Sequence, residues 1–191
     1  MSQLYITSDW HFCHDKPFIY EARGFSSVDE MNEEIVKRHN EVVGKNDLVY
    51  FLGDTVLNDN ERGLEYIKRL NGYFYWIWGN HDTENKKRMI LEGIKNSEEV
   101  GDAIKITYNK VNLYLSHYPT DTLNPRDSGL KQLVYSIHGH IHRKEKVKQD
   151  SNRLSLQYNI CLDAHNLYPV RMDDITAEII EAYDESKDRS W

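Results

Sequence analysis

The chain contains few cysteines and prolines, and its apolar runs are short. Among its 191 residues there are 2 cysteines and 4 prolines. Cys13 and Cys161 are too few for a disulfide framework or a cysteine-rich zinc module, so we expect free, buried thiols. The longest apolar run extends from Tyr73 to Trp78, whereas a membrane-spanning helix needs roughly 20 apolar residues. We therefore expect neither a disulfide-stapled scaffold nor a membrane protein.

The N-terminal residues and the charge exclude further classes of protein. Residues 1–9 contain no basic stretch, apolar segment or small-residue cleavage site, so we expect no signal peptide and a cytoplasmic location. The 31 acidic residues outnumber the 24 lysines and arginines, which gives a formal net charge of −7. Proteins that grip long nucleic acids need a broad basic surface. Stable nucleic-acid binding is therefore not expected, and the oligomeric state is left open.

Short apolar runs alternate with helical patterns along the first half of the chain. Ser27 and Glu30 form the Ser-x-x-Glu pattern of a capping box that precedes an amphipathic segment. The expected elements are helices over residues 28–43 and within 64–70, and strands at residues 4–6, 48–52 and 73–78. This alternation is typical of βαβ units around a central sheet.

The second half has a more antiparallel character. Two apolar runs flank Asn109-Lys110, which indicates a two-residue hairpin turn. The expected elements are strands at residues 103–108, 111–115, 135–137 and within 154–161, a closing helix over 175–183, and a frayed tail at 184–191. Since no linker or repeat divides the chain, we predict a single α/β domain with two sheets, residues 1–191.

Polar residues of metal-binding type follow the expected strands. The set comprises Asp9, His11, Asp54, Asn80, His117, His140 and His142. Ligand-binding residues of α/β sheets gather at the carboxyl ends of the strands, so we expect these side chains to converge. Their oxygen and nitrogen donors suit manganese, iron or zinc. Because seven donors exceed one tetrahedral site, they fit two metal ions that share a bridging carboxylate.

Each of these residues also has a structural interpretation. Asp9 and Asp54 are typical of helix caps or turns, Asn80 of a turn, and His117 of a strand end. The ordered pattern as a whole favours the metal site. His138 is expected to face away from His140, because neighbouring side chains alternate along a strand. The histidines at positions 39 and 165 are not assigned to the site.

The order of these residues resembles a known signature. The blocks are Asp9-Trp10-His11, Gly53-Asp54, Gly79-Asn80-His81-Asp82, His117 and Gly139-His140-Ile141-His142. They are similar to the D-x-H, G-D, G-N-H-[DE], H and G-H-x-H blocks of the calcineurin-like metallophosphoesterases. Residues 159–163 and Pro169 resemble, more loosely, a late strand and turn of small members of the family. The resemblance implies a four-layer α/β/β/α sandwich, with two mixed β-sheets flanked by helices and a metal site at the carboxyl ends of the strands.

The resemblance also implies a role for each residue. Asp9, His11 and His142 would bind one divalent metal ion, Asn80, His117 and His140 a second, and Asp54 would bridge them. Mn²⁺ is favoured for both positions, with iron, zinc or nickel as alternatives. A metal-bridging hydroxide would attack phosphorus in line. His81 would protonate the leaving oxygen, and Asp82 would orient the His81 ring.

Substrate-binding residues are expected in two further segments. The loop over residues 9–25 is longer than a plain strand-to-helix connection needs. It contains His14, expected near the metals or the phosphate, and Arg23, expected to clamp a phosphate with two hydrogen bonds. Arg143 opens a basic run and is a further candidate for phosphate binding. Ordinary loop packing and a solvated basic loop are the alternatives.

Departures from the family pattern indicate the type of ester. No Asp-Arg-Gly follows Gly53-Asp54, so a protein phosphatase is not expected, and the short segment between Asp54 and Asn80 leaves no room for a cap domain. We predict an uncapped phosphodiesterase that acts on small phosphorylated substrates such as nucleotides or cyclic nucleotides. The alternatives are a phosphomonoesterase of broad specificity, a non-catalytic scaffold for protein partners, and a nucleic-acid-binding module that stacks bases on residues 73–78.

Overall fold

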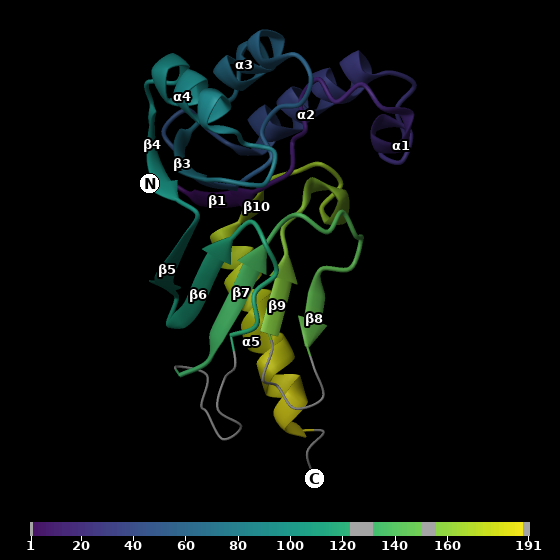
Figure 1. Ribbon diagram of the computed structural model, residues 1–191. Coiled ribbons are helices and arrows are strands. Elements are labelled where there is room, and N and C mark those ends of the chain that lie inside the picture. Colours follow the sequence, from purple (N-terminus) through teal and green to yellow (C-terminus); the bar gives the residue numbers. More distant parts are fainter. Residues whose placement is uncertain (1, 123–131, 150–155, 189–191) are drawn as a thin grey trace.

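The computed structural model describes residues 2–122, 132–149 and 156–188. These residues form two five-stranded sheets, with strand orders β10-β1-β2-β3-β4 and β5-β6-β7-β9-β8 (Figure 1). The first sheet is parallel except for β10, and the second is antiparallel at its two edge pairs and parallel along β6-β7-β9. The prediction of an α/β fold with two mixed sheets flanked by helices is confirmed.

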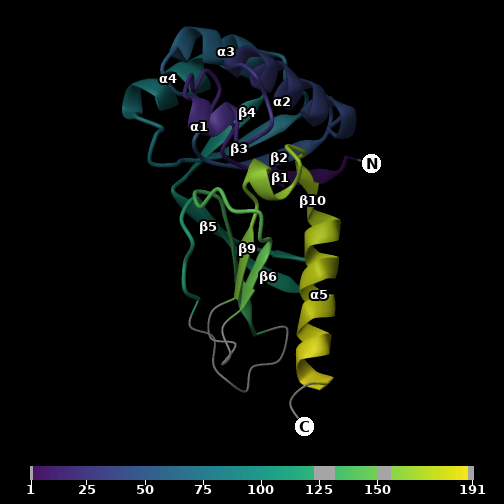
Figure 2. The same ribbon diagram turned by 90° about the vertical axis from the view of Figure 1, so that its right-hand side faces the viewer.

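The first sheet is covered on one face by helices, as Figures 1 and 2 show. Its strands are β1 (Leu4–Thr7), β2 (Leu48–Leu52), β3 (Tyr73–Ile77), β4 (Ser97–Gly101) and β10 (Val170–Arg171). The helices of this half are α1 (Pro17–Tyr20), α2 (Val28–Val42), α3 (Asn60–Lys68) and α4 (Glu84–Gly93). Strands β1, β2 and β3 are parallel, so their carboxyl ends meet at one edge of the sheet.

The second sheet is accompanied by the C-terminal helix, which lies alongside it in Figures 1 and 2. Its elements are β5 (Ala103–Tyr108), β6 (Val111–Ser116), β7 (Val134–His138), β8 (Val147–Gln149), β9 (Leu156–Asn159), the short helix η1 (Leu162–Ala164) and α5 (Met172–Asp188). The predicted hairpin joins β5 to β6, and both turn residues, Asn109 and Lys110, have positive φ, as two-residue hairpin turns require.

Several element boundaries differ from the predictions. Ser27 caps α2 as expected, but the Glu30 carboxylate accepts the backbone N–H of Ser26 instead of that of Ser27. Helix α5 continues to Asp188, beyond the closing helix expected over residues 175–183. The fraying expected at 184–191 stays a prediction, and residues 189–191 lie outside the described residues. Helix α4 and strand β4 were missed because their sequences are mostly polar and charged.

Two apolar cores hold the layers together. In the core between the helices and the first sheet, the ring of Trp10 stacks on Phe51 with centroids 3.9 Å apart and meets Trp76 edge-on. Phe74 and Trp76 are fully buried there. The predicted run 73–78 is therefore a core strand with its larger rings inside, which removes the support for a base-stacking platform. The second core joins the second sheet to α5 and to Ile6, Leu52 and Ile77 of the first sheet.

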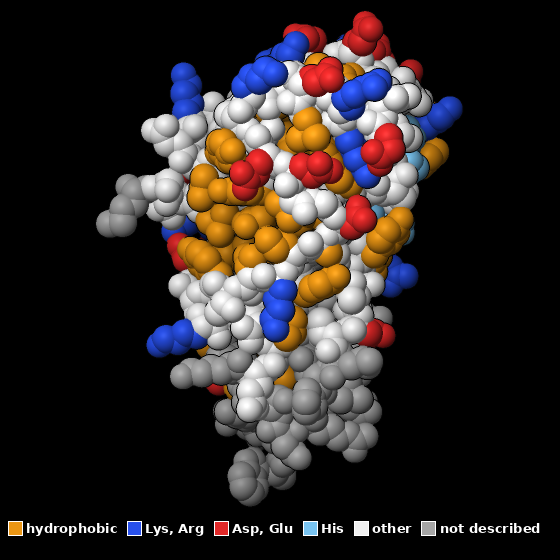
Figure 3. Space-filling model, turned by 60° about the vertical axis from the view of Figure 1, so that its left-hand side comes forward, with side chains coloured by type: hydrophobic (Ala, Val, Ile, Leu, Met, Phe, Trp, Pro, Cys, Tyr) orange, Lys and Arg blue, Asp and Glu red, His pale blue; other side chains and the backbone are white. Residues whose placement is uncertain are grey.

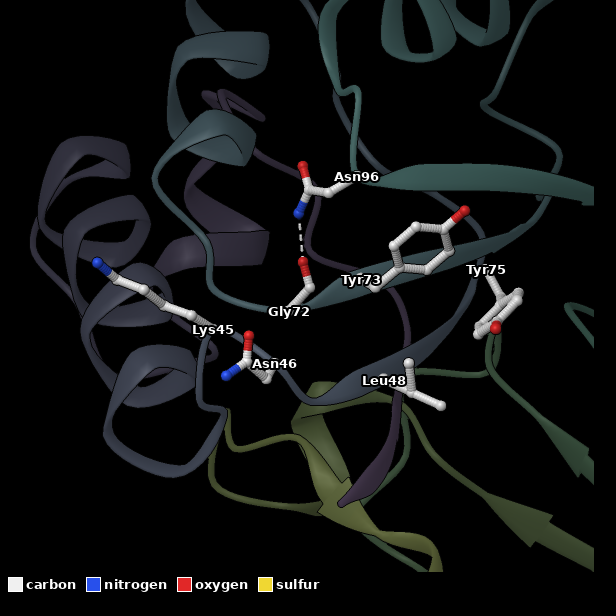
Figure 4. Close-up of a pocket in the computed structure, with 7 residues that line it drawn as sticks. All are labelled: Lys45, Asn46, Leu48, Gly72, Tyr73, Tyr75 and Asn96. Atoms are coloured by element: carbon white, nitrogen blue, oxygen red, sulfur yellow. Dashed lines mark hydrogen bonds between the residues drawn. The ribbon is translucent and has the colours of Figure 1, made fainter. Parts of the chain in front are cut away.

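Some aromatic and apolar side chains of the sheets remain half-buried. At the amino end of β3, a pocket of about 400 Å³ is lined by Lys45, Asn46, Leu48, Gly72, Tyr73, Tyr75 and Asn96 (Figure 4). The Asn96 amide donates to the carbonyl of Gly72 within it. Figure 3 shows apolar side chains gathered on the side of the molecule that carries β4 and β5. Within the described residues, every helix is too short or too polar to cross a lipid bilayer.

We expect stability to fall as the pH falls from about 6.5 towards 4, partly because of His39. Burial lowers the pKa of this ring from 6.5 to about 4, and its Nε2 lies 2.8 Å from the carbonyl of Asn71. Below pH 6.5 the unfolded chain therefore binds a proton that the folded protein does not, which costs roughly 2–3 kcal/mol by pH 4.5. Denaturant unfolding of the metal-free proteins at pH 6.5 and pH 4.5 measures this loss. Between these pH values, the free energy of unfolding should fall roughly 2–3 kcal/mol less in His39→Gln than in the wild type. An equal fall in the two proteins would contradict the role of His39.

Candidate metal centre

The predicted metal-binding residues lie at the carboxyl ends of five strands. Asp9 and His11 follow β1, Asp54 follows β2, Asn80 follows β3, His117 follows β6, and His140 and His142 follow β7. The structure brings all of them together where the ends of the two sheets meet. Convergence of residues scattered along the sequence was the central prediction for this site, and the distances below agree with it.

The first cluster consists of Asp9, His11 and His142. Nε2 of His11 lies 3.0 Å from Nε2 of His142 and 3.7 Å from Oδ1 of Asp9. Nε2 of His142 lies 3.5 Å from the same Asp9 oxygen. Asp54 borders this cluster, because its Oδ2 is 3.6 Å from Nε2 of His11.

The second cluster consists of Asn80, His117 and His140. Nε2 of His117 lies 2.9 Å from Oδ1 of Asn80 and 3.2 Å from Nδ1 of His140, and that Nδ1 lies 3.0 Å from the Asn80 oxygen. Oδ2 of Asp54 is 3.5 Å from Nε2 of His117. The same carboxylate oxygen therefore faces both clusters.

The spacing of these donor atoms fits divalent cations. With metal–ligand bonds of about 2.1 Å, two ligands of one ion lie about 3.0 Å apart in octahedral and about 3.4 Å apart in tetrahedral coordination. Within the first cluster the donor separations are 3.0, 3.5 and 3.7 Å, and within the second they are 2.9, 3.0 and 3.2 Å. Each cluster can therefore hold a divalent cation through nitrogen and oxygen donors.

Unusual backbone conformations aim these side chains. Five of the predicted ligands have positive φ: Asp9 (60°), His11 (51°), Asp54 (62°), His140 (70°) and His142 (46°). Residues other than glycine rarely adopt this conformation, and such strain gathers at functional sites. Gly79 and Gly139 allow the turns to approach, since a methyl group at either would overlap the carboxylate of Asp54 or Asp9.

Two histidines are oriented by acceptors behind them. The Nδ1–H of His117 donates to the carbonyl of Leu52 at 2.8 Å, which leaves Nε2 free to bind a metal. Nδ1 of His142 lies 2.8 Å from Oδ2 of Asp163, which directs Nε2 of His142 to the first cluster in the same way. Acceptors of this kind fix the tautomer and raise the basicity of a ligating imidazole.

The Asp9 carboxylate is fully buried but charged. It accepts hydrogen bonds from the Ser8 hydroxyl, from the His140 backbone N–H at 3.0 Å and from the Cys161 thiol at 2.9 Å. Burial alone would raise the pKa of Asp9, but the neighbouring rings of His11, His142 and His117 hold this pKa far below its usual value. Burial and the negative charge of Asp9 raise the pKa of Cys161, so its thiol stays protonated. Both cysteines are free and buried, as predicted.

The structure corrects the role predicted for Arg23. Its side chain is only 2% exposed, and its guanidinium pairs with both carboxylate oxygens of Asp163 at 3.1 and 3.0 Å. The same group donates to the backbone carbonyls of Asp9 and Trp10. Because these acceptors occupy the guanidinium, Arg23 does not clamp a phosphate but holds Asp163 behind His142. Asp163 was missed, and only the loose likeness of residues 159–163 to small family members pointed to it.

The structure also corrects the role predicted for Asp82. Its carboxylate accepts the backbone N–H groups of Asp54 at 2.7 Å, Gly79 at 2.9 Å and Thr55 at 3.0 Å, together with the Thr55 hydroxyl. Asp82 therefore ties the loop after β3 to the loop after β2 and does not accept a hydrogen bond from the His81 ring. It positions Asp54 rather than His81.

His81 lies at the mouth of the centre. Its ring is 44% exposed, and its Nε2 is 4.0 Å from Oδ2 of Asp54. Its backbone is fixed on both sides, because its N–H donates to Oδ1 of Asp54 at 2.9 Å and its carbonyl accepts from Nζ of Lys86 at 2.8 Å. Burial lowers the pKa of Lys86. This arrangement leaves the His81 ring open to a bound substrate.

The remaining candidates differ in their distance from the clusters. The His14 ring lies 5.5 Å from the His11 ring, and burial lowers the pKa of His14 to about 4, so it is neutral at pH 7. Arg143 is exposed, and its predicted contact with phosphate stays a prediction. His138 is buried, and its Nδ1 bonds the carbonyl of Gly139, in agreement with its exclusion from the ligand set. His165 likewise bonds a backbone carbonyl, that of Asn159.

Comparison with known proteins decides the family. The family model described as calcineurin-like phosphoesterase matches residues 2–184. The chain belongs to the calcineurin-like phosphoesterases. This family assignment and the two clusters together define a metal-dependent phosphoesterase with a divalent-metal site.

This calcineurin-like phosphoesterase is similar to several other proteins. An uncharacterized protein of Methanocaldococcus jannaschii is 32% identical over 184 residues, which are 95% of this chain and 93% of that protein. A solved structure of a protein of unknown function from Aquifex aeolicus has a TM-score of 0.66 at 21% identity, over 93% of this chain and 99% of that one. That likeness shows the fold. A solved archaeal phosphodiesterase is more distant, with a TM-score of 0.48 at 17% identity over 82% of each chain.

Replacing Asp163 by asparagine should weaken metal binding by the calcineurin-like phosphoesterase. The variant keeps the shape of the side chain but removes the charge that orients His142 and neutralises Arg23, a loss that typically lowers metal affinity 10- to 100-fold. Titration of metal-free protein with Mn²⁺ by calorimetry measures the effect. As a control, Asp173→Asn removes a carboxylate outside the site and should leave the affinity for Mn²⁺ unchanged. If Asp163→Asn binds Mn²⁺ as tightly as this control, Asp163 does not support the centre.

Proposed function

We propose that the protein hydrolyses phosphodiesters with two divalent cations bound at the metal centre, Mn²⁺ being favoured over iron, zinc or nickel. The observation that carries this proposal is the position of Asp54, whose Oδ2 lies 3.6 Å from Nε2 of His11 and 3.5 Å from Nε2 of His117. A carboxylate in this position can bridge two ions. Two such ions lower the pKa of a bound water molecule and neutralise charge on the phosphoryl oxygens.

The chain supplies the remaining chemistry through His81. Its ring is exposed beside Asp54, and its backbone is anchored by Asp54 and Lys86. An imidazole held there reaches a phosphate ester that lies over the two clusters and can donate its proton to the leaving oxygen. General acid catalysis of this kind contributes a factor of about 10²–10⁴ to the rate.

The surroundings of the centre favour diesters over protein substrates. Only α3, β3 and the loops beside them connect Asp54 to Gly79, so this segment places no cap domain over the site. Asn80 and His81 are exposed, so the centre opens to solvent on the side of these residues. Gly53-Asp54-Thr55-Val56 lacks the Asp-Arg-Gly extension of the protein phosphatases. We infer that the substrates are small phosphodiesters such as nucleotides or cyclic nucleotides.

Hydrolysis of bis-p-nitrophenyl phosphate and p-nitrophenyl phosphate by metal-stripped protein tests this proposal. Activity should return with Mn²⁺, should be higher on the diester, and should fall below detection in Asp54→Ala. His81→Gln should keep its metal content but lose about 10²–10³ in kcat on a diester with an alkoxide leaving group, because only the proton donor is removed. It should lose far less on the p-nitrophenyl esters, whose phenolate leaves without a proton. Glu84→Gln, an exposed change just after the His81 loop, is the control and should match the wild type.

The other outcomes are distinct. A higher rate on the monoester would indicate a phosphomonoesterase, and a metal-loaded protein that is inert towards both esters would indicate a scaffold for protein partners. Either result would contradict the proposal of a phosphodiesterase.

A further inference from the structure

Two exposed aromatic side chains lie at the rim of the metal centre. Among the described residues, the large apolar side chains that are exposed are Phe18 (69%), Val42 (36%), Tyr118 (50%) and Val147 (46%). Single exposed apolar residues are ordinary on protein surfaces. Here, however, both exposed aromatic rings contact histidines: Phe18 meets His14, and Tyr118 meets His117 and His140.

Tyr118 stands directly beside the second cluster. Its ring centroid is 4.8 Å from that of His140 and 5.1 Å from that of His117, and both contacts are edge-on. The backbone carbonyl of Tyr118 accepts the Ser116 hydroxyl at 2.9 Å, which fixes the chain where it leaves β6. The ring is thus anchored by two candidate metal ligands while half of its surface faces solvent.

Phe18 stands on the side of the first cluster. Its ring meets His14 edge-on at 5.8 Å, and the His14 ring lies 5.5 Å from that of His11. The two metal clusters are therefore flanked by one exposed aromatic ring on each side.

We propose that Tyr118 and Phe18 form a subsite that stacks against the planar base of a nucleoside phosphodiester, with Tyr118 as the principal contact. This inference rests on the proposed function, because it names the group attached to the phosphate that the metal centre holds. Stacking suits this position, since every base presents a flat π-face to an aromatic ring. Tyr118 contributes more than Phe18 because it touches candidate metal ligands directly, whereas Phe18 is separated from the first cluster by His14.

Two esters with the same leaving group test the inference. Thymidine 5′-(p-nitrophenyl phosphate) and methyl p-nitrophenyl phosphate both release p-nitrophenol, and they differ only in the nucleoside or methyl group that remains on the phosphate. The wild type should prefer the nucleoside ester in kcat/KM. Tyr118→Ala should reduce that preference about 10- to 100-fold, mainly through KM, which corresponds to the loss of one base–aromatic stack.

Matched variants separate stacking from folding. Tyr118→Phe keeps the ring and should keep the preference, while Phe18→Ala should reduce it less than Tyr118→Ala. Tyr73→Ala removes a half-buried tyrosine at the opposite end of β3 and should leave the preference unchanged. Calorimetry with thymidine 5′-monophosphate and Mn²⁺-loaded protein should show the same order of affinities, which gives a readout independent of turnover.

The failure of this inference differs from the failure of the proposed function. If neither ester is hydrolysed, the proposed phosphodiesterase activity is wrong. If both are hydrolysed but the preference is absent, or is the same in Tyr118→Ala as in the wild type, the aromatic subsite is wrong and the phosphodiesterase proposal stands.

Discussion

The structure depends on two buried carboxylates, Asp9 and Asp54, at the point where the two sheets meet. Asp9 is fully buried and Asp54 is 2% exposed. An ionised carboxylate in such a place is costly unless hydrogen bonds and positive charge compensate it. Both residues also have positive φ, a backbone conformation that is strained for residues other than glycine. Burial and backbone strain of this kind persist only where the surrounding residues stabilise the same conformation.

The surrounding network provides that support in two directions. On one side, Asp82 gathers the backbone N–H groups of Asp54, Thr55 and Gly79, and thereby locks the loops after β2 and β3 to each other. On the other side, Arg23 binds Asp163 and the carbonyl of Asp9, so that one guanidinium connects the turn after β1 to the acceptor of His142. The polar groups nearest the centre thus tie together chain segments that are far apart in sequence.

The ligand set could be predicted from the sequence because it depends on local order. Each ligand follows a strand of strong apolar character, such as Leu48–Leu52, and parallel strands place their carboxyl ends together whatever the details of packing. The glycines beside the ligands were also visible as part of the blocks. The edges of the sheets could not be predicted in the same way, since β4 and β10 are short or polar and owe their structure to their neighbours.

The roles of Arg23, Asp82 and Asp163 could not be predicted because they depend on contacts across the fold. Arg23 and Asp163 are far apart in sequence, and nothing near either residue indicates that they form a buried ion pair. Asp82 adjoins His81 in the chain, yet its side chain turns towards Asp54. Because Asp82 and His81 are neighbours in the sequence, a hydrogen bond between them is expected. In the turn, however, the Asp82 carboxylate instead accepts backbone N–H groups, including that of Asp54.

The most direct test of this account is an anomalous difference map from crystals of the protein soaked in Mn²⁺. Two peaks are expected, one among Asp9, His11 and His142 and the other among Asn80, His117 and His140, with the Asp54 carboxylate between them. A single peak, or peaks away from these residues, would contradict the central claim that Asp54 joins two metal sites into one centre.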